Sequence, residues 1–101
     1  MAGSGSLNLV PISSSQIDIQ YSVNVTGSGR QAIMDIIDTP THGGAFFLRV
    51  ELGAGFHEST YNLTGLQPST QYRVGLYDFK SQSDYTQLDF KICYYLSKRR
   101  T

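Results

Sequence analysis

The residues that could do metal chemistry are few in this sequence and lie far apart. His42 and His57 are the two histidines, each in or beside a glycine-containing segment, and Glu58 follows the second. A protein metal site needs at least three ligands brought together, and the sequence offers no third ligand at a suitable spacing. We therefore expect solvated loop histidines, no metal site and no cofactor.

Nucleophilic catalysis has equally little support. Serine and threonine are abundant, but no Gly-x-Ser-x-Gly turn occurs, and the single cysteine, Cys93, has no histidine near it in the sequence. The glycine-rich pieces at 3–5, 27–29 and 53–55 precede no helix whose N-terminus could hold a phosphate. The sequence therefore predicts a protein that is not an enzyme.

Most of the chain alternates apolar and polar residues with the period of a β-strand. Because successive side chains of a strand point to opposite faces, this pattern predicts strands with one buried face. The apolar run at 7–12 contains Pro11, which donates no amide hydrogen bond and so indicates an edge strand. The strands that the pattern predicts are 7–12, 16–25, 46–52, 58–63, 72–77 and 87–96, with a polar loop at 78–84 before the last strand.

Residues 31–38 fit two periodicities. The three isoleucines have helical spacing, whereas Ala32, Met34 and Ile36 have strand spacing. The β-branched isoleucines, the shortness of the segment, and the proline and glycines that follow it favour a strand.

The segment 58–77 carries the most specific pattern. Gly65 accepts a positive φ, and Pro68 fixes φ and has no amide hydrogen, so the chain must leave the sheet between two strands. The arrangement resembles the corner between strands E and F of a fibronectin type III domain. The residues that match the family pattern are Leu63, Gly65, Leu66, Pro68, Thr70, Tyr72 and Val74.

This resemblance implies an all-β fold, a seven-stranded antiparallel β-sandwich over residues 7–96. One sheet would hold the strands at 7–12, 16–25 and 58–63, and the other sheet the remaining four. The family usually carries a core tryptophan on its second strand, where this chain has Tyr21. We expect residues 1–6 to be a flexible leader, native or added by cloning, and residues 97–101 to be a solvated basic tail.

Composition narrows the class of partner. A chain of 101 residues fits one domain, and its single cysteine excludes an internal disulfide. Formal charge is zero, but through Ser97 there are five basic against eight acidic residues, which argues against nucleic acid as the main partner. No apolar stretch approaches the length of a membrane span, so we expect no membrane insertion.

A candidate interaction surface lies on the outward side of the strands at 46–52, 72–77 and 87–96. Aromatic residues mixed with arginine are typical of the centres of protein interfaces, although single exposed aromatic residues are also ordinary on small β domains. If Cys93 points outward, it could form an intermolecular disulfide in a homodimer or stay a free thiol, and the sequence does not choose between these. The residues of this surface are Phe47, Arg49, Arg73, Tyr77, Lys91, Cys93 and Tyr95.

Two glycosylation sequons are present, at Asn24 and Asn62. The strand alternation turns both asparagines outward. Either the sites are used in a secretory pathway or the motifs arise by chance in a sequence rich in serine and threonine.

The resemblance implies a non-catalytic protein-interaction or adhesion module of a larger extracellular or cell-surface protein. One alternative is a structural or decoration domain of a virion or phage assembly. The other is a carbohydrate-binding accessory domain of a secreted enzyme, which would use exposed aromatics such as Phe47, Tyr77 and Tyr95. A sandwich fold by itself does not choose among these functions.

The corner residues generate a first prediction. In the family, the tyrosine at the start of strand F donates its hydroxyl to the backbone of the preceding corner, here near Leu66 to Pro68. We expect Tyr72→Phe to lower the free energy of unfolding by about 1 to 3 kcal/mol, because a buried acceptor loses its donor. Chemical denaturation measures this, and equal midpoints for mutant and parent would refute it.

Overall fold

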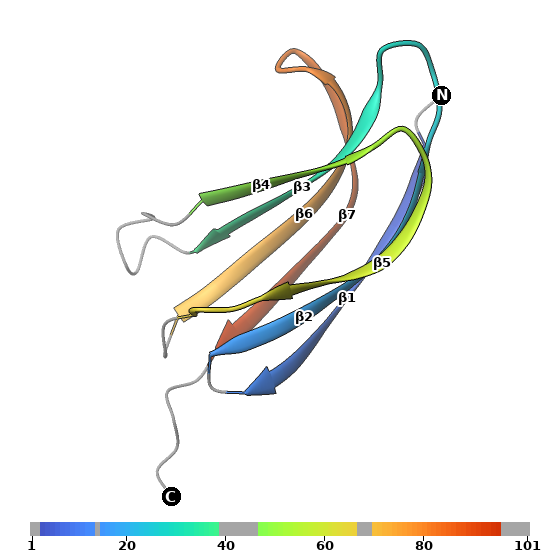
Figure 1. The fold of residues 1–101 in the computed structure, drawn as a ribbon. Coiled ribbons are helices and arrows are strands. Elements are labelled where there is room, and N and C mark those ends of the chain that lie inside the picture. The colour runs from blue at the N-terminus through green and yellow to red at the C-terminus, as the bar shows by residue number, and fades with distance from the viewer. Residues whose placement is uncertain (1–2, 14, 39–46, 67–69, 96–101) are drawn as a thin grey trace, which may run out of the picture.

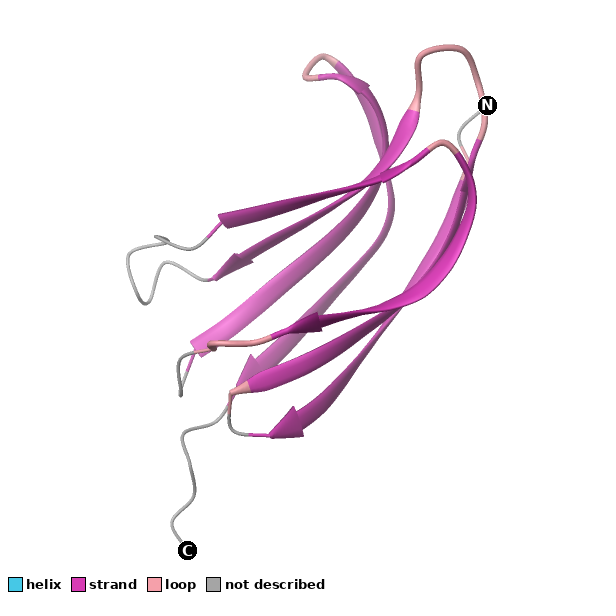
Figure 2. Cartoon of the chain, in the orientation of Figure 1, coloured by secondary structure: helices cyan, strands magenta, loops and turns pink. Residues whose placement is uncertain are grey.

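In the computed structural model, the described residues are 3–13, 15–38, 47–66 and 70–95, and they form strands joined by turns (Figures 1 and 2). This part of the chain contains no helix long and apolar enough to cross a membrane. The seven strands are β1 (Ser4–Ser13), β2 (Gln16–Val25), β3 (Gln31–Asp38), β4 (Phe47–Gly53), β5 (Gly55–Leu63), β6 (Thr70–Ser81) and β7 (Asp84–Tyr95).

The strands pair antiparallel in two sheets, with orders β1-β2-β5 and β4-β3-β6-β7. The fold is therefore the all-β sandwich that the sequence predicted, with the predicted division of strands between sheets. β1 is an edge strand, which accommodates Pro11. It begins at Ser4, so part of the segment assigned to a leader pairs with β2.

The core forms where the two sheets face each other, as the alternating pattern requires. Residues 31–38 are a strand, which confirms the favoured interpretation, and Tyr21 packs against the core while remaining partly exposed. The fully packed core consists of Leu7, Ile17, Ile19, Val23, Val25, Ala32, Met34, Ile36, Leu63, Leu66, Tyr72, Val74 and Leu76.

The predicted polar loop at 78–84 is wrong. β6 continues to Ser81 and β7 begins at Asp84, so the two strands form a tight hairpin. Asp78 is a buried strand residue with 0% exposure, not a loop residue. Its carboxylate accepts hydrogen bonds from Arg30 and from the Gly3 amide. Both partners are distant in the sequence, so the local pattern could not reveal them.

The prediction of which residues of the last strand point inward and which point outward is also wrong. The register shifts so that Tyr77 pairs with Gln87 and Leu76 with Asp89, which leaves Leu88 as an extra residue in a β-bulge. The alternation therefore reverses beyond the bulge. Phe90 and Ile92 point outward and are exposed, whereas Cys93 turns inward, pairs with Tyr72 and packs against the core.

Two carboxylates, Asp78 buried and Asp89 partly buried, connect β1 and the residue before it to the opposite sheet. Asp78 accepts hydrogen bonds from Arg30 Nε at 2.7 Å and from the Gly3 amide at 2.9 Å. Asp89 accepts one from the Leu7 amide at 2.7 Å. Burial alone would raise the pKa of Asp89, but the hydrogen bonds that it accepts lower it overall. Closure of the sandwich on this side thus relies on charged acceptors.

We expect Asp78→Asn to lower the free energy of unfolding by about 3 kcal/mol, because a fully buried side chain loses the charge that accepts from Arg30 Nε and the Gly3 amide, and part of its acceptor capacity becomes a donor. Urea denaturation measures the change. Asp84→Asn is the matched control: Asp84 also pairs with Arg30, at 3.2 Å, but its side chain is 54% exposed, so its loss should be clearly smaller. A midpoint for Asp78→Asn equal to that of the parent would contradict the proposed role of this pair.

Candidate functional site

The face of the β4-β3-β6-β7 sheet that points away from the core carries the candidate site, and we call it the outer face. Register places Asp35 beside Arg49, Arg73 beside Ile92, and Tyr77 beside Ile33. Arg49, Arg73 and Tyr77 thus occupy the face on which the sequence predicted them.

Other members of the predicted surface do not belong to the outer face or cannot be placed there. Lys91 pairs with the core residue Val74, so it points toward the interior side at the sheet edge, where Nζ lies 3.0 Å from Asp89. The side chains of Phe47 and Tyr95 lie outside the described part of the structure.

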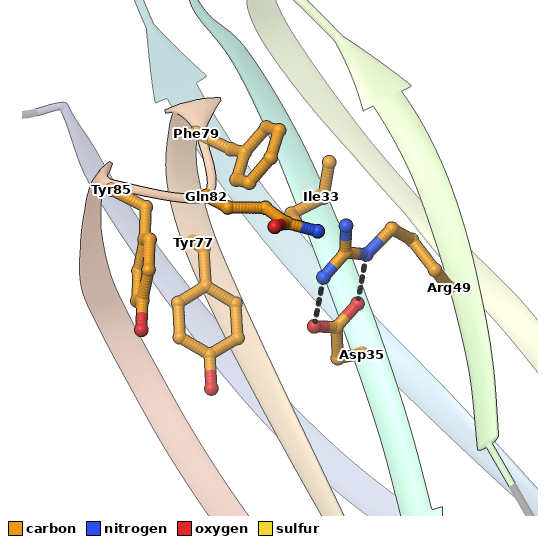
Figure 3. A pocket seen from close by; sticks show the side chains of 7 residues that line it. All are labelled: Ile33, Asp35, Arg49, Tyr77, Phe79, Gln82 and Tyr85. Atoms are coloured by element: carbon orange, nitrogen blue, oxygen red, sulfur yellow. Dashed lines mark hydrogen bonds and ion pairs between the residues drawn. The ribbon is translucent and has the colours of Figure 1, made fainter.

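A hollow of about 250 Å³ opens on the outer face near the β6–β7 hairpin (Figure 3). Side chains from β3, β4, β6, β7 and the hairpin turn converge on it, as the sticks in Figure 3 show. Ile33 is buried beneath these side chains although it faces away from the core. The residues that line the hollow are Ile33, Asp35, Arg49, Tyr77, Phe79, Gln82 and Tyr85.

The polar part of the hollow is a bidentate ion pair. Arg49 donates from Nε and Nη2 to the two oxygens of Asp35, at 2.8 and 2.9 Å. These hydrogen bonds raise the pKa of Arg49 above its ordinary value. The Arg49 guanidinium also lies 5.1 Å from the ring centroid of Phe79. Arg49 is therefore held in one orientation by a carboxylate and by an aromatic ring.

The aromatic part joins three rings. Tyr85 meets Tyr77 edge-on at 5.8 Å and stacks near Phe79 at 6.4 Å between centroids. Burial and the Asp35 charge raise the pKa of Tyr77, so its phenol stays protonated at neutral pH. A Cβ at Gly75 would lie 2.6 Å from the Tyr77 hydroxyl oxygen, which shows that this ring covers the glycine.

A strip of outward residues that is apolar except for Gln87 continues from the hollow along β7, and we call it the apolar strip. Tyr85, Phe90 and Ile92 are 55%, 38% and 52% exposed. The sequence interpretation missed the last two because it carried one alternation through the whole strand, and the bulge at Leu88 reverses it. Two sequence features could have suggested an irregular edge strand: Asp89 directly after Leu88, and the turn residues just before β7.

The opposite face of the molecule, on the β1-β2-β5 sheet, has a different character. A shallow depression there is lined mainly by polar side chains, including Asn8, Gln20 and Thr60. Asn24 and Asn62 are exposed, as predicted, and Asn62 donates to Asp18 at 2.8 Å. Whether either sequon is used stays a prediction. Phe56, 63% exposed, is the large exposed aromatic residue of β5.

The residues considered for metal and thiol chemistry are dispersed. His57 Nε2 contacts the Ala54 carbonyl oxygen at 2.8 Å, and His42 lies outside the described residues. No group of three His, Cys, Asp or Glu side chains within the described ranges could hold a metal ion. Burial raises the pKa of Cys93, so the predicted outward thiol is instead a half-buried and less reactive one.

The corner that carries the family resemblance is partly described. Gly65 has φ 74°, Leu66 is buried, and the Leu66 amide donates to the Ser15 carbonyl oxygen at 3.1 Å. Tyr72 is buried, as expected for the tyrosine that bonds to the corner in the family. Pro68 lies outside the described residues, so the predicted contact of the Tyr72 hydroxyl with this corner stays a prediction.

No family model and no curated protein matches this sequence. Among solved structures, the chain is similar to the sensor domain of the anti-sigma factor RsgI4 from Pseudobacteroides cellulosolvens. The TM-score is 0.61 at 10% sequence identity, over 97% of this chain and 98% of that one. At this identity, the similarity shows a shared fold over nearly the whole length of both chains.

Proposed function

We propose that this chain is a fibronectin-type-III-like, non-catalytic module that binds a protein partner through its outer face. The observation that supports the proposal best is the exposed apolar strip of Tyr85, Phe90 and Ile92 beside Arg73. Large apolar and aromatic side chains next to arginine are the residues that dominate binding energy at protein interfaces. The opposite face presents mainly polar side chains and is the less suitable of the two.

The preorganised ion pair of Arg49 and Asp35 also suits recognition. A bidentate pair at 2.8 and 2.9 Å holds its side chains before a partner arrives, so less side-chain entropy is lost on binding. The similarity to a sensor domain of a regulatory protein supports a module that recognises rather than catalyses. The family resemblance further supports a place in a larger extracellular or cell-surface protein.

A carbohydrate-binding role is the second candidate, and the hollow is the observation that favours it. Ring faces and edges from Tyr77, Phe79 and Tyr85 border it together with the amide of Gln82 and the Arg49–Asp35 pair. A cavity of about 250 Å³ with a few convergent polar groups is suited to a small neutral ligand such as one sugar unit.

The protein-binding proposal predicts the outcome of a peptide-display selection on the intact chain. We expect the chain to select binding peptides, and the double substitution Phe90→Ser, Ile92→Ser to weaken their binding by about tenfold or more, because interface anchors are lost. Titration calorimetry on the selected peptides measures this.

Phe56→Ser on the opposite sheet is the matched control and should bind these peptides as the parent does. Unfolding midpoints show whether each variant is folded. The protein-binding proposal fails if no peptide is selected, or if the peptides bind the double variant and the parent equally.

The carbohydrate candidate predicts that a panel of neutral oligosaccharides contains a ligand. Its binding should disappear in Tyr85→Ala, which removes an exposed ring of the hollow, and persist in Phe56→Ser. Calorimetric titration provides the readout. If the parent chain binds none of the oligosaccharides, this second candidate is rejected.

A further inference from the structure

Arg73 differs from the other arginines that the structure describes. Arg30 and Arg49 each donate to aspartate carboxylates at 2.7 to 3.3 Å. Arg73 has no carboxylate partner within the described ranges, and its Nε is shielded from solvent without a hydrogen-bond partner. A shielded donor of this kind is costly to leave unpaired, by about 1 to 3 kcal/mol, and such groups call for an explanation.

The cross-strand neighbours of Arg73 are apolar, while the polar Gln71 occupies the preceding outward position on β6. In register, Ile37 lies beside it on β3 and Ile92 beside it on β7. Along β6, the next outward position is Gly75, and the ring of Tyr77 lies over that glycine. Arg73 is only half-buried, so part of its side chain stays accessible within this apolar setting.

The acidic residues nearby do not neutralise Arg73. Asp35 lies one outward position along, beside Gly75, but both of its oxygens accept hydrogen bonds from Arg49. Glu51 is on the far strand of the sheet, opposite Ile33. Among the side chains that the structure describes, Arg73 is thus a guanidinium without a carboxylate partner, beside Ile92 at the end of the apolar strip.

We propose that Arg73 is the specificity-determining anchor of the outer face, and that the partner is a protein segment with an aspartate or glutamate carboxylate flanked by large apolar side chains. The inference rests on the proposed protein-binding function. The carboxylate accepts from the Arg73 guanidinium, while its apolar neighbours cover Phe90 and Ile92.

The pattern of charge favours a carboxylate over a phosphate. A phosphate group carries nearly two negative charges and is usually held by several donors or by clustered basic residues. Among the described outward residues of this sheet, Arg73 is one guanidinium with an isoleucine beside it on each neighbouring strand, and Arg49 is already paired. A singly charged carboxylate matches that one positive charge, and the apolar surroundings strengthen the pairing by excluding water.

Peptides selected on the intact chain test this inference through their composition. We expect them to be enriched in Asp or Glu within two residues of Leu, Ile, Phe, Tyr or Trp. Arg73→Gln and Arg73→Glu should each weaken their binding by roughly tenfold or more, the effect expected when one side of a desolvated charge pair is removed. Changing the peptide's acidic residue to Lys should restore binding to Arg73→Glu. Lys80→Gln, an exposed basic residue beyond Phe79 on the same strand, is the matched control and should leave binding unchanged.

Two results would overturn the inference while leaving the proposed function intact. The first is a set of peptides without acidic residues whose binding is nevertheless lost in Phe90→Ser, Ile92→Ser. The second is acidic peptides that bind Arg73→Gln as tightly as the parent chain. Failure to select any peptide, or peptides insensitive to both sets of substitutions, would refute the proposed function and the inference together.

Discussion

The buried carboxylate of Asp78 is the constraint on which closure of this sandwich depends. A charge with 0% exposure is tolerated only when it is paired and hydrogen-bonded. Arg30 supplies the charge from the turn between β2 and β3, and the Gly3 amide supplies a second donor just before β1. The Asp78 side chain on β6 thus contacts both the turn between β2 and β3 and the residue before β1. Any pairing that displaced Arg30 would leave a buried ion uncompensated, which disfavours alternative arrangements of these strands.

The β-bulge at Leu88 has the largest consequence for the proposed function. Because the extra residue reverses the alternation, Cys93 moves into the sandwich and Phe90 and Ile92 move out. Without the bulge, β7 would present Lys91 and a cysteine to a partner. With it, the outer face carries an apolar strip beside Arg73, and the thiol is half-buried. Bulges of this kind commonly redirect side chains at sheet edges.

The two outward faces of the molecule differ in chemical character. The outer face of the β4-β3-β6-β7 sheet combines stacked rings, a bidentate ion pair and one unneutralised guanidinium. The β1-β2-β5 face is mainly polar and includes both sequon asparagines. Attached glycans on the second face would leave the first accessible. This asymmetry is the reason that we propose the outer face, and not the opposite face, as the binding surface.

The sequence by itself determined the existence of the seven strands and most of the core, and the resemblance of its corner segment to a known family implied how the strands divide between sheets. A period-two pattern needs only neighbouring residues to decide which side is buried, and so Ile17, Ile19, Met34 and Val74 were all assignable in advance. Gly65 likewise indicated that the chain leaves the sheet, because glycine readily adopts the positive φ found there.

Only the tertiary structure decided the burial of Asp78, the facing of β7 and the hollow. Asp78 lies 48 positions from Arg30, and no local pattern shows that they meet. The bulge at Leu88 arises from the pairing register of β7 with β6. Register is a property of the two strands together, so neither strand's own sequence shows it. The hollow needs four strands side by side before its rings and ion pair converge. Local alternation specifies which way a side chain points from a regular strand, whereas long-range pairing specifies where the strand stops being regular.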